Sequence, residues 1–363
     1  MKKVKLNLGP RSYQILIGSG VLSSLTATLN RLDLAKVAIV VTNPTVRRLY
    51  GTKVRNSLKG AVESVYFVQV PDSEKSKSIG QCIKLVETFT ARDQGRGVLA
   101  VALGGGVIGD LTGFAAAIYR RGIPYIQLPT TLLAQVDSSI GGKVAIDLRS
   151  GKNLVGAFYQ PRLVISDLDL LQSLGLAQVR QALAEIIKYA IIADQRFFAY
   201  LENNLKDILK LNPQKLQRII EYCSQIKARI VAGDETDQTG QRMVLNLGHT
   251  TAHALEAACG YKKAYAHGEA VGLGILVACE LAQELQLISP AAVQRISQLI
   301  ARTGLPTQIT GVSLKKILTA MACDKKFSKG KNRFVLPIQI GKVTIKENIP
   351  QQLISRAIQS RMR

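Results

Sequence analysis

All three histidines of the chain lie in one short stretch, from His249 to His267. His249 and His253 are four residues apart, so on a helix they share one face, one turn from each other. His267 follows a Gly-Tyr-Lys break at 260–262, and a turn between two helices would bring it back beside the first pair. Imidazole is the commonest metal ligand and the usual proton shuttle. This confinement predicts one shared site; two surface histidines and one core histidine are the alternative.

A carboxylate on another apolar segment is the natural partner of these imidazoles. The segment ALAEIIKYAII at 182–192 carries Glu185 and Lys188, which are three residues apart and share a helical face. An ion pair would explain both residues. The alternative is that Glu185 joins His249 and His267 as a third ligand, because three protein ligands and an open position are typical of catalytic zinc. The sequence HTTAH lacks the glutamate of HExxH, which argues against peptide hydrolysis.

A glycine-rich turn in the first half predicts a phosphate-binding loop. The sequence GGGVIGD at 104–110 satisfies G-x-G-x-x-G, follows the apolar run 97–103 and leads into an apolar helix. Glycines there let the backbone approach a pyrophosphate, and a helix N-terminus favours its negative charge. No acid follows about 20 residues later to hold a ribose; Arg120 and Arg121 stand there instead, so the ribose contact must come from another loop.

The stretch 129–161 is too polar for a core and is predicted to be a long functional loop. It places Lys143 and Lys152 among glycines, threonines and serines. Lysines in such a loop indicate binding of anionic groups. The alternative is a flexible loop with two solvated lysines.

The elements that must position these residues differ between the two halves of the chain. Apolar runs at 36–43, 64–71, 97–103, 123–128 and 163–166 read as strands, with a helical pattern at 78–92. Alternation of strand and helix predicts a Rossmann-like α/β domain with a parallel sheet.

From about residue 170 onward, helical patterns dominate. Helices are expected at 177–193, 195–209, 213–232, 246–259, 268–287, 290–303 and 313–323, with a small hairpin at 333–345. The expected organisation is an N-terminal α/β domain over 1–168, a mostly α-helical domain over 169–363, and an active site in the cleft between the domains.

Composition limits the classes of function. The 363 residues carry a net charge of +23, but no run of five basic residues occurs and aromatics are only 5%, so no nucleic-acid partner is expected. A polyanionic small substrate explains the charge as well. No apolar run approaches the roughly 20 residues that cross a bilayer, so no membrane association is expected. Five cysteines without CxxC spacing and the lack of a signal peptide indicate a reducing, cytoplasmic setting.

The chain resembles the 3-dehydroquinate synthase family of sugar phosphate cyclases. The blocks that carry the resemblance occur in the family's order: GGGVIGDLTGF, YRRGIPYIQLPTTLLAQVDSSIGGK, GKNLVGAFYQP, AEIIKY, NLGHTTAHALE, HGEAVGLG and DKK followed by RFVLP. The resemblance runs from about residue 41 to 341, nearly the whole chain.

This resemblance implies a reaction of the shikimate pathway. The substrate would be 3-deoxy-D-arabino-heptulosonate 7-phosphate, and the products 3-dehydroquinate and phosphate. In this family NAD oxidises the C5 hydroxyl, phosphate is eliminated, the ketone is reduced, and the ring closes by an aldol step. A divalent metal, Zn²⁺ with Co²⁺ as a possible substitute, and a homodimer are also implied.

The resemblance also assigns roles to residues of this chain. Glu185, His249 and His267 would bind the metal. His253 would relay protons beside the phosphate, and Lys143, Glu185 and Lys188 would also act in catalysis. The substrate would contact Arg121 (reaching from the partner subunit), Asp137, Lys143, Asn153, Lys188, Lys227, Arg242, Asn246, His253, and Lys325 or Lys326. NAD would contact Asp72, Lys75, Gly105, Gly106, Val107, Asp110, Thr130, Thr131, Lys143, Lys152, Leu170 and Ser173.

The chain departs from the family pattern at four places. Pro71-Asp72 replaces the usual Gly-Glu of the ribose loop, Asn43 replaces an acid, and Ala182 and Ala252 replace glycines. The alternatives are a relative that cyclises a heptulose 7-phosphate or glucose 6-phosphate, a polyol dehydrogenase of similar layout, and a basic binding protein without catalysis. Arg242, Asn246 and His253 argue against the first of these, because a sugar without a carboxylate does not need that set.

Overall fold

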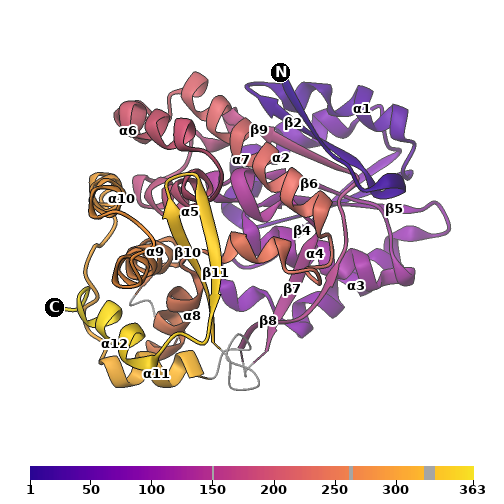
Figure 1. The fold of residues 1–363 in the computed structure, drawn as a ribbon. Helices are drawn as coiled ribbons and strands as arrows, with labels where there is room; N and C mark the ends of the chain where they lie inside the picture. The colour runs from indigo at the N-terminus through magenta and orange to yellow at the C-terminus, as the bar shows by residue number, and fades with distance from the viewer. Residues whose placement is uncertain (149–150, 261–264, 323–331) are drawn as a thin grey trace. The chain divides into compact units, whose positions relative to one another are not determined.

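The chain divides into two compact units, described in turn (Figure 1). The computed structural model describes residues 1–148, 151–260, 265–322 and 332–363. The first unit comprises Met1–Leu174 and Pro213–Thr236, and the second comprises Gly175–Asn212 and Asp237–Arg363. Helix α7 (Pro213–Gly233) lies within the first unit. The sequence predicts a single domain boundary, between residues 168 and 169. Local sequence patterns do not show that α7, which follows this boundary, lies within the first unit.

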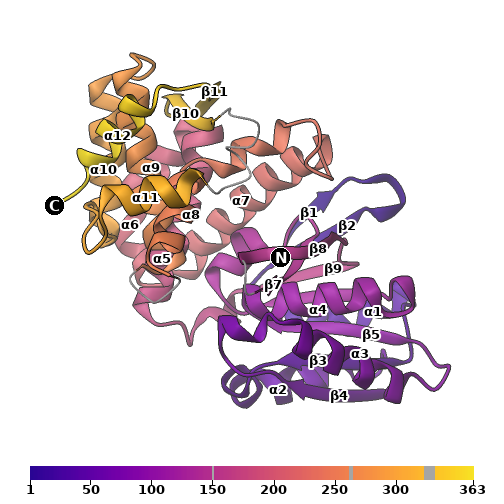
Figure 2. The same cartoon turned by 90° about the horizontal axis from the view of Figure 1, so that it is seen from below.

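A mostly parallel seven-stranded sheet forms the centre of the first unit, which confirms the predicted α/β class (Figure 2). The strand order is β1-β2-β9-β6-β5-β3-β4, with only β1 antiparallel to its neighbour. Every residue of the central strands is buried, as in parallel strands that helices cover on both faces. The bounds are β1 Lys2–Leu6, β2 Tyr13–Gly18, β3 Val37–Thr42, β4 Ser64–Gln69, β5 Val98–Gly104, β6 Tyr125–Pro129 and β9 Leu163–Asp167.

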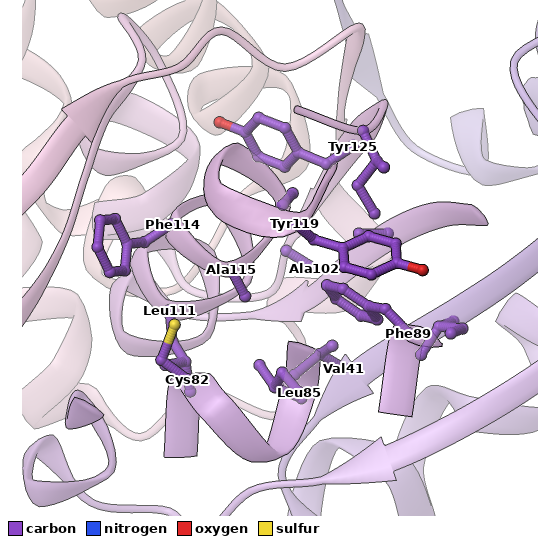
Figure 3. Packing of buried hydrophobic residues seen from close by; sticks show 14 of the residues in the cluster. Val41, Cys82, Leu85, Phe89, Ala102, Leu111, Phe114, Ala115, Tyr119 and Tyr125 are labelled. Atoms are coloured by element: carbon purple, nitrogen blue, oxygen red, sulfur yellow. The ribbon is translucent and has the colours of Figure 1, made fainter. Parts of the chain in front are cut away.

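Alternate residues of each strand enter different cores because successive side chains point to opposite faces. In β3, Ile39 and Val41 enter the core under α3 (Ile79–Asp93) and α4 (Gly106–Ile118). Figure 3 shows this core, in which the rings of Phe89 and Tyr119 meet edge to face at 5.7 Å. Ala38 and Val40 enter the other core with residues of α1 (Leu25–Leu32) and α2 (Pro44–Leu58). The two cores fix the sheet that carries the loops.

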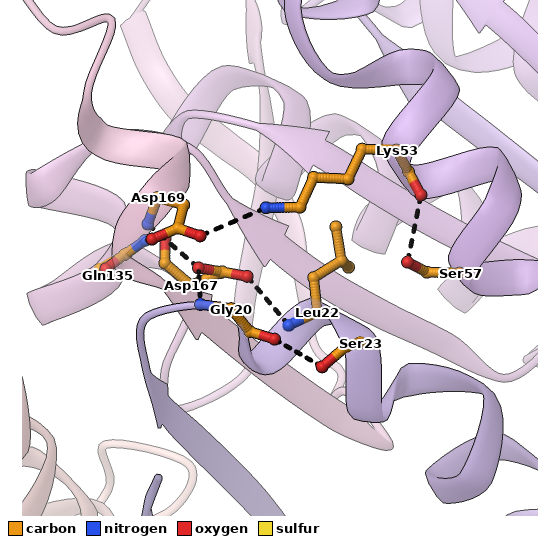
Figure 4. Close-up of polar contacts among 8 residues, drawn as sticks. All are labelled: Gly20, Leu22, Ser23, Lys53, Ser57, Gln135, Asp167 and Asp169. Atoms are coloured by element: carbon orange, nitrogen blue, oxygen red, sulfur yellow. Dashed lines mark hydrogen bonds and ion pairs between the residues drawn. The ribbon is translucent and has the colours of Figure 1, made fainter.

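A buried aspartate ties together loops near the carboxyl end of β9 (Figure 4). The carboxylate of Asp167 accepts from the backbone N–H groups of Gly20 at 3.0 Å, Leu22 at 2.9 Å and Asp169 at 3.0 Å. Its carbonyl oxygen accepts from Gln135 Nε2 at 2.9 Å. These bonds satisfy a fully buried carboxylate and hold the segment that follows the sheet.

The stretch 129–161 is not the irregular loop that its polarity predicted. It contains a π-helical turn, η5 (Ala134–Ser138), and an antiparallel hairpin of β7 (Lys143–Leu148) and β8 (Gly151–Phe158). Val144 and Ile146 of this hairpin pack into the α3–α4 core. The alternation of polar and apolar residues in β7 carried that signal, which the glycines and lysines obscured.

The second unit is mostly helical, as predicted. Its helices are α5 Leu176–Ala193, α6 Gln195–Leu209, α8 His249–Ala258, α9 His267–Glu284, α10 Pro290–Thr303, α11 Leu314–Ala322 and α12 Gln351–Gln359, with a hairpin of β10 Arg333–Gln339 and β11 Lys342–Glu347. The helix expected at 246–259 begins only at His249, because a 3₁₀ turn, η7 (Gln241–Asn246), precedes it. In the described part of the chain, no helix has the length and apolarity to span a bilayer.

Candidate active site

Three helices of the second unit bring Glu185, His249 and His267 together. Glu185 lies in the middle of α5, whereas His249 and His267 are the first residues of α8 and α9. One potential ligand atom from each residue lies within 4.8 Å of the other two. The Nε2 atoms of His249 and His267 are 3.3 Å and 3.4 Å from Oε1 of Glu185. The carboxylate and two imidazoles thus form a possible metal site.

Glycines allow the helices to approach closely enough for this convergence. A Cβ on Gly274 of α9 would lie 2.0 Å from the carbonyl oxygen of Gly248, which precedes α8. A Cβ on Gly268 would lie 2.2 Å from the carbonyl oxygen of Gln181 in α5. The start of α9 is fixed by the carboxylate of Glu269, which accepts from the Ala266 N–H at 2.8 Å. His267 is therefore held at the helix start by contacts with both neighbours.

The buried carboxylate of Glu185 fits a bound cation. Burial raises its pKa, but Lys188 and His249 outweigh burial and hold the pKa well below its usual value. Lys188 Nζ forms an ion pair with Oε2. Neither carboxylate oxygen has a hydrogen-bond partner of acceptable geometry among the described residues, and the side chain is only 1% exposed. The ion pair between Glu185 and Lys188, one of the two interpretations of the sequence, is therefore present. It involves Oε2, and Oε1 is a potential ligand atom.

The two imidazoles differ in their protonation. Burial lowers the pKa of His249 to about 4, so this ring is neutral at pH 7. Its Nδ1 lies 3.2 Å from the carbonyl oxygen of Leu247, which can only accept, so the proton is on Nδ1. The lone pair of Nε2 then faces an oxygen of Glu185, an arrangement that a cation between them would stabilise. The donor set of two nitrogens and one oxygen fits zinc.

His267 is cationic when no metal is bound. Burial lowers its pKa, but Glu185 and Glu256 more than offset burial and raise the pKa to about 10. Its Nδ1 lies 3.6 Å from Oε1 of Glu256. A proton on this ring supplies positive charge between two carboxylates, where a metal ion would otherwise supply it.

Three further predicted residues, His253, Arg242 and Asn246, lie close to His249 in the sequence and differ in their exposure to solvent. His253 is exposed, and its ring meets that of His249 edge to face at 5.5 Å. This contact agrees with the predicted shared helical face. Arg242 and Asn246 lie in η7, directly before α8; Arg242 is buried and Asn246 is half-buried.

In the first unit, the predicted glycine loop joins β5 to α4. Gly105 is the N-cap residue of α4 and makes no side-chain capping bond. A Cβ on Gly105 would lie 3.1 Å from Thr131 Cγ2, and one on Gly106 would lie 3.2 Å from Ser138 Oγ. Side chains at these positions would fill the space beside the helix N-terminus. The backbone thus fits the pyrophosphate of a dinucleotide; Val107 lies in the first turn of the helix.

A lysine that sequence reasoning missed lies beside this loop. Lys77 is buried, and its Nζ is 2.8 Å from Asp110 Oδ2 in α4. The same ammonium donates to Oδ1 of Asn153, whose N–H donates to Asp147 at 2.8 Å. Burial lowers the pKa of Lys77, but Asp110 and nearby carboxylates raise it overall. Burial raises the pKa of Asp110 to about 6, and Lys77 opposes that rise.

The predicted ribose-loop residues, Asp72 and Lys75, are both exposed. The acid that lies near the buried lysine is Glu74, with Oε1 3.9 Å from Lys77 Nζ. The spacing of an acid and a lysine three residues apart occurs at Glu74 and Lys77 as well as at Asp72 and Lys75. The two pairs differ in burial, because Lys77 is buried whereas Asp72, Glu74 and Lys75 are exposed.

A second lysine, Lys227, contacts Asp137, and both are predicted substrate-binding residues. Nζ of Lys227 in α7 lies 2.7 Å from the carbonyl oxygen of Asp137 and 2.5 Å from its Oδ1. Thr131 Oγ1 accepts from the Ala134 N–H at 3.2 Å at the start of the same turn, and Thr130 is buried. The prediction placed Lys227 in the helical domain, whereas α7 carries it into the first unit.

The remaining predicted residues of the first unit are spread over its surface and core. Lys143 is exposed with Nζ 5.9 Å from the Phe158 ring centroid, and Lys152 is half-buried. Leu170 is fully buried. Ser173 Oγ accepts from Tyr50 Oη at 2.8 Å. Lys325 and Lys326 lie outside the described residues.

Arg121 belongs to a strained turn. Arg120 and Arg121 have φ values of 49° and 62°, in the left-handed region that non-glycine residues rarely adopt. Asp93, only 2% exposed, holds this turn through Arg120 Nη1 at 3.1 Å and Tyr119 Oη at 3.0 Å. Arg121 itself is exposed.

The departures from the family pattern have local structural roles. Asn43 caps α2, because its Oδ1 accepts from the Val46 N–H at 2.7 Å. Ala182 and Ala252 are fully buried in α5 and α8. Their methyl groups are accommodated within the helical core.

Comparisons with known proteins agree with this geometry. The family model described as 3-dehydroquinate synthase N-terminal matches residues 67–181, and the one described as 3-dehydroquinate synthase C-terminal matches residues 182–327. A curated 3-dehydroquinate synthase from Desulforamulus reducens (strain ATCC BAA-1160 / DSM 100696 / MI-1) is 43% identical over 352 residues, which cover 97% of this chain and 98% of that protein.

Solved structures of related cyclases share the fold. A 2-deoxy-scyllo-inosose synthase complexed with carbaglucose-6-phosphate, NAD⁺ and Co²⁺ has a TM-score of 0.90 at 25% identity, over 99% of this chain and 100% of that chain. ValA, a 2-epi-5-epi-valiolone synthase from Streptomyces hygroscopicus subsp. jinggangensis 5008 with NAD⁺ and Zn²⁺ bound, has a TM-score of 0.86 at 25% identity, over 99% and 97% of the two chains. Because the curated relative matches almost end to end, the chain belongs to the 3-dehydroquinate synthase family.

Proposed function

We propose that this chain converts 3-deoxy-D-arabino-heptulosonate 7-phosphate into 3-dehydroquinate and phosphate, with NAD and a divalent metal as cofactors. The convergence of Glu185, His249 and His267 within 4.8 Å is the observation that carries the proposal. Membership of the family gives the reaction, and the related cyclases carry NAD⁺ with Co²⁺ or Zn²⁺.

The metal and NAD would supply the chemistry that side chains lack. A bound divalent ion would polarise the hydroxyl that is oxidised, and NAD would accept and return the hydride. Glu185, His249 and His267 would hold the ion, with Lys188 fixing the second oxygen of the carboxylate. Gly105, Gly106 and Val107 would hold the pyrophosphate at the start of α4, beside Asp110.

The charged ends of the substrate account for the other polar residues. Arginine and lysine match phosphate and carboxylate groups. For the phosphate we assign Lys143, Asn153 and His253, with His253 relaying protons. For the carboxylate and hydroxyl groups we assign Lys188, Lys227, Arg242 and Asn246, with Asp137 orienting Lys227.

The remaining assignments are part of the same proposal. NAD would also contact the exposed Asp72 and Lys75 and the residues Thr130, Thr131, Lys143, Lys152, Leu170 and Ser173. Residues 1–168 would form the NAD-binding domain and 169–363 the metal- and substrate-binding domain, of which α7 lies within the first compact unit. A homodimer in the cytoplasm, with Arg121 reaching the partner's site and Lys325 or Lys326 contacting phosphate, completes the proposal.

A phosphate-release assay with metal analysis tests the proposed function. Purified protein should release phosphate from the heptulosonate phosphate, lose that activity with a chelator and regain it with Zn²⁺ or Co²⁺. Removal of bound NAD should abolish release until NAD is returned. Absence of release from this substrate, together with turnover of a heptulose 7-phosphate or glucose 6-phosphate, would assign the chain to a different cyclase reaction.

The substitution Glu185→Gln tests the carboxylate ligand directly. It keeps the side-chain shape but removes the charge that binds the ion, so metal content and turnover should fall together. Glu202→Gln is the matched control, because Glu202 pairs with Arg295 in the same unit and has no part in the proposed site. Full metal occupancy and a normal rate in Glu185→Gln would leave Glu185 as only the ion-pair partner of Lys188.

A further inference from the structure

A second acid, Glu256 of α8, lies near the ring nitrogen of His267 that does not face Glu185. Glu256 lies seven residues after His249 and three after His253, so all three share one face of α8. Its Oε1 is 3.6 Å from His267 Nδ1, and its side chain is only 9% exposed. The acid is thus part of the helical face that carries two of the site's histidines.

The two nitrogens of His267 face two different carboxylates. Nε2 lies 3.4 Å from Oε1 of Glu185, and Nδ1 lies 3.6 Å from Oε1 of Glu256. A metal ligand must offer a lone pair, and the other ring nitrogen then carries the proton. With Nδ1–H directed at Glu256, the ring offers Nε2 to the position beside Glu185.

The two imidazoles therefore have different outer partners. His249 Nδ1 faces the neutral carbonyl of Leu247, whereas His267 Nδ1 faces a carboxylate. A charged partner makes an imidazole a stronger ligand than a neutral one does. His267 also needs more support, because its side chain is 37% exposed against 13% for His249.

The charges around the site add a second argument. Lys188 pairs with Oε2 of Glu185 and weakens the attraction of that carboxylate for a cation. Glu256 brings a further negative charge close to the ligand set, on the Nδ1 side of His267. Because both acids are buried, their charges are poorly screened by solvent.

We propose that Glu256 is a positioning residue for the metal site: it fixes the ring orientation and tautomer of His267 and strengthens metal binding through Nε2. This inference rests on the proposed metal-dependent function. It assigns Glu256 to metal binding rather than to contact with the substrate.

Metal affinity of purified variants tests this role. Competition with a chromogenic chelator would give the Zn²⁺ affinity of the wild type, Glu256→Ala and Glu256→Gln, and the visible spectrum of bound Co²⁺ would report ligand geometry. Glu256→Ala should bind Zn²⁺ about 10- to 100-fold more weakly and shift the Co²⁺ bands. Glu256→Gln should lose less affinity, because its amide oxygen still accepts from Nδ1–H while the charge is gone.

A matched control separates this role from folding. Glu280→Gln removes an acid of α9 that pairs with Arg361, and it should leave Zn²⁺ affinity and the Co²⁺ spectrum unchanged. Far-UV circular dichroism of the metal-free proteins identifies any variant that does not fold. Should Glu256→Ala fail to fold, the intermediate affinity of Glu256→Gln carries the test.

The outcomes distinguish this inference from the proposed function. Wild-type affinity and spectra in both Glu256 variants, with metal-dependent phosphate release intact, would overturn the positioning role alone. A wild-type protein that binds no metal and releases no phosphate would overturn the proposed function and this inference with it.

Discussion

At the scale of single residues, the proposed metal site contains one neutral imidazole, His249, and one protonated imidazole, His267. Burial holds His249 neutral, whereas two carboxylates keep His267 protonated. The raised pKa of His267 stabilises the metal-free fold below pH 6.5, and this stabilisation is lost as the pH rises towards about 10. A metal ion can use the Nε2 lone pair of His267 only after that proton leaves.

Metal binding should therefore release a proton from His267. Between pH 7 and 9 the apparent affinity for Zn²⁺ should rise about tenfold per pH unit, because protonation of His267 favours the metal-free state. His249, with a pKa of about 4, should release none in this range. Calorimetry in two buffers of different ionisation enthalpy should give about one proton per ion; a pH-independent affinity would contradict this protonation.

Lys77 connects α4 and the β7–β8 hairpin to the loop before α3. Lys77→Met would leave the buried carboxylate of Asp110 without its ion-pair partner. Removing one partner of a buried pair costs about 3–5 kcal/mol, and the lower end applies because Asp110 keeps 20% of its side chain exposed. The free energy of unfolding, measured in urea, should fall by about 3 kcal/mol.

The matched control is Lys75→Met, because Lys75 is exposed two residues earlier. It should change the free energy of unfolding by less than about 0.5 kcal/mol. Equal effects of the two substitutions would show that burial does not distinguish these lysines.

At the scale of elements, the site depends on how closely α5, α8 and α9 approach one another. The helices meet at glycines, and each contributes one ligand near a helix start or middle. Buried packing of this kind tolerates little added volume, because protein interiors are close-packed. Separation of the helices would move the ligands apart as well.

Gly274→Ala should separate α9 from α8. The new methyl would lie 2.0 Å from the carbonyl oxygen of Gly248, and overpacking of this kind costs about 1–3 kcal/mol or more. Unfolding in urea should show that loss, and metal content should fall because His249 and His267 move apart.

Gly272→Ala is the control on the same helix. Its methyl would meet Leu305 at 3.5 Å, an ordinary contact, and alanine favours a helix over glycine by up to about 1 kcal/mol. This variant should keep its metal and its stability. A Gly274→Ala protein as stable and metal-loaded as Gly272→Ala would refute the close approach.

At the scale of the whole molecule, the proposed dimer requires Arg121 to serve the partner's site. The turn that carries Arg121 is strained and is held by Asp93, which keeps an exposed arginine in a defined position. The charge of +23 favours encounter with an anionic substrate.

Mixing two inactive variants should restore activity if Arg121 crosses to the partner. In a mixed dimer of Arg121→Ala and Glu185→Gln, one site has an intact Glu185 and receives an intact Arg121. Random reassociation of equal amounts should therefore recover roughly a quarter of wild-type activity. Recovery should follow subunit exchange, measured by sedimentation; no recovery despite exchange would place Arg121 in its own subunit's site.

The sequence alone determined the family, the α/β and helical halves and most helix bounds, because periodicity and ordered motifs are local properties. It also indicated Glu185, His249 and His267 as metal ligands, since chemistry restricts which side chains can bind a metal. Only the tertiary structure decided that α7 returns to the first unit, that 129–161 contains a hairpin, and that Lys77 and Glu256 face the predicted residues. These features depend on packing between segments that are distant in the sequence. A local sequence pattern does not show which segments will pack together and therefore which side chains will be buried.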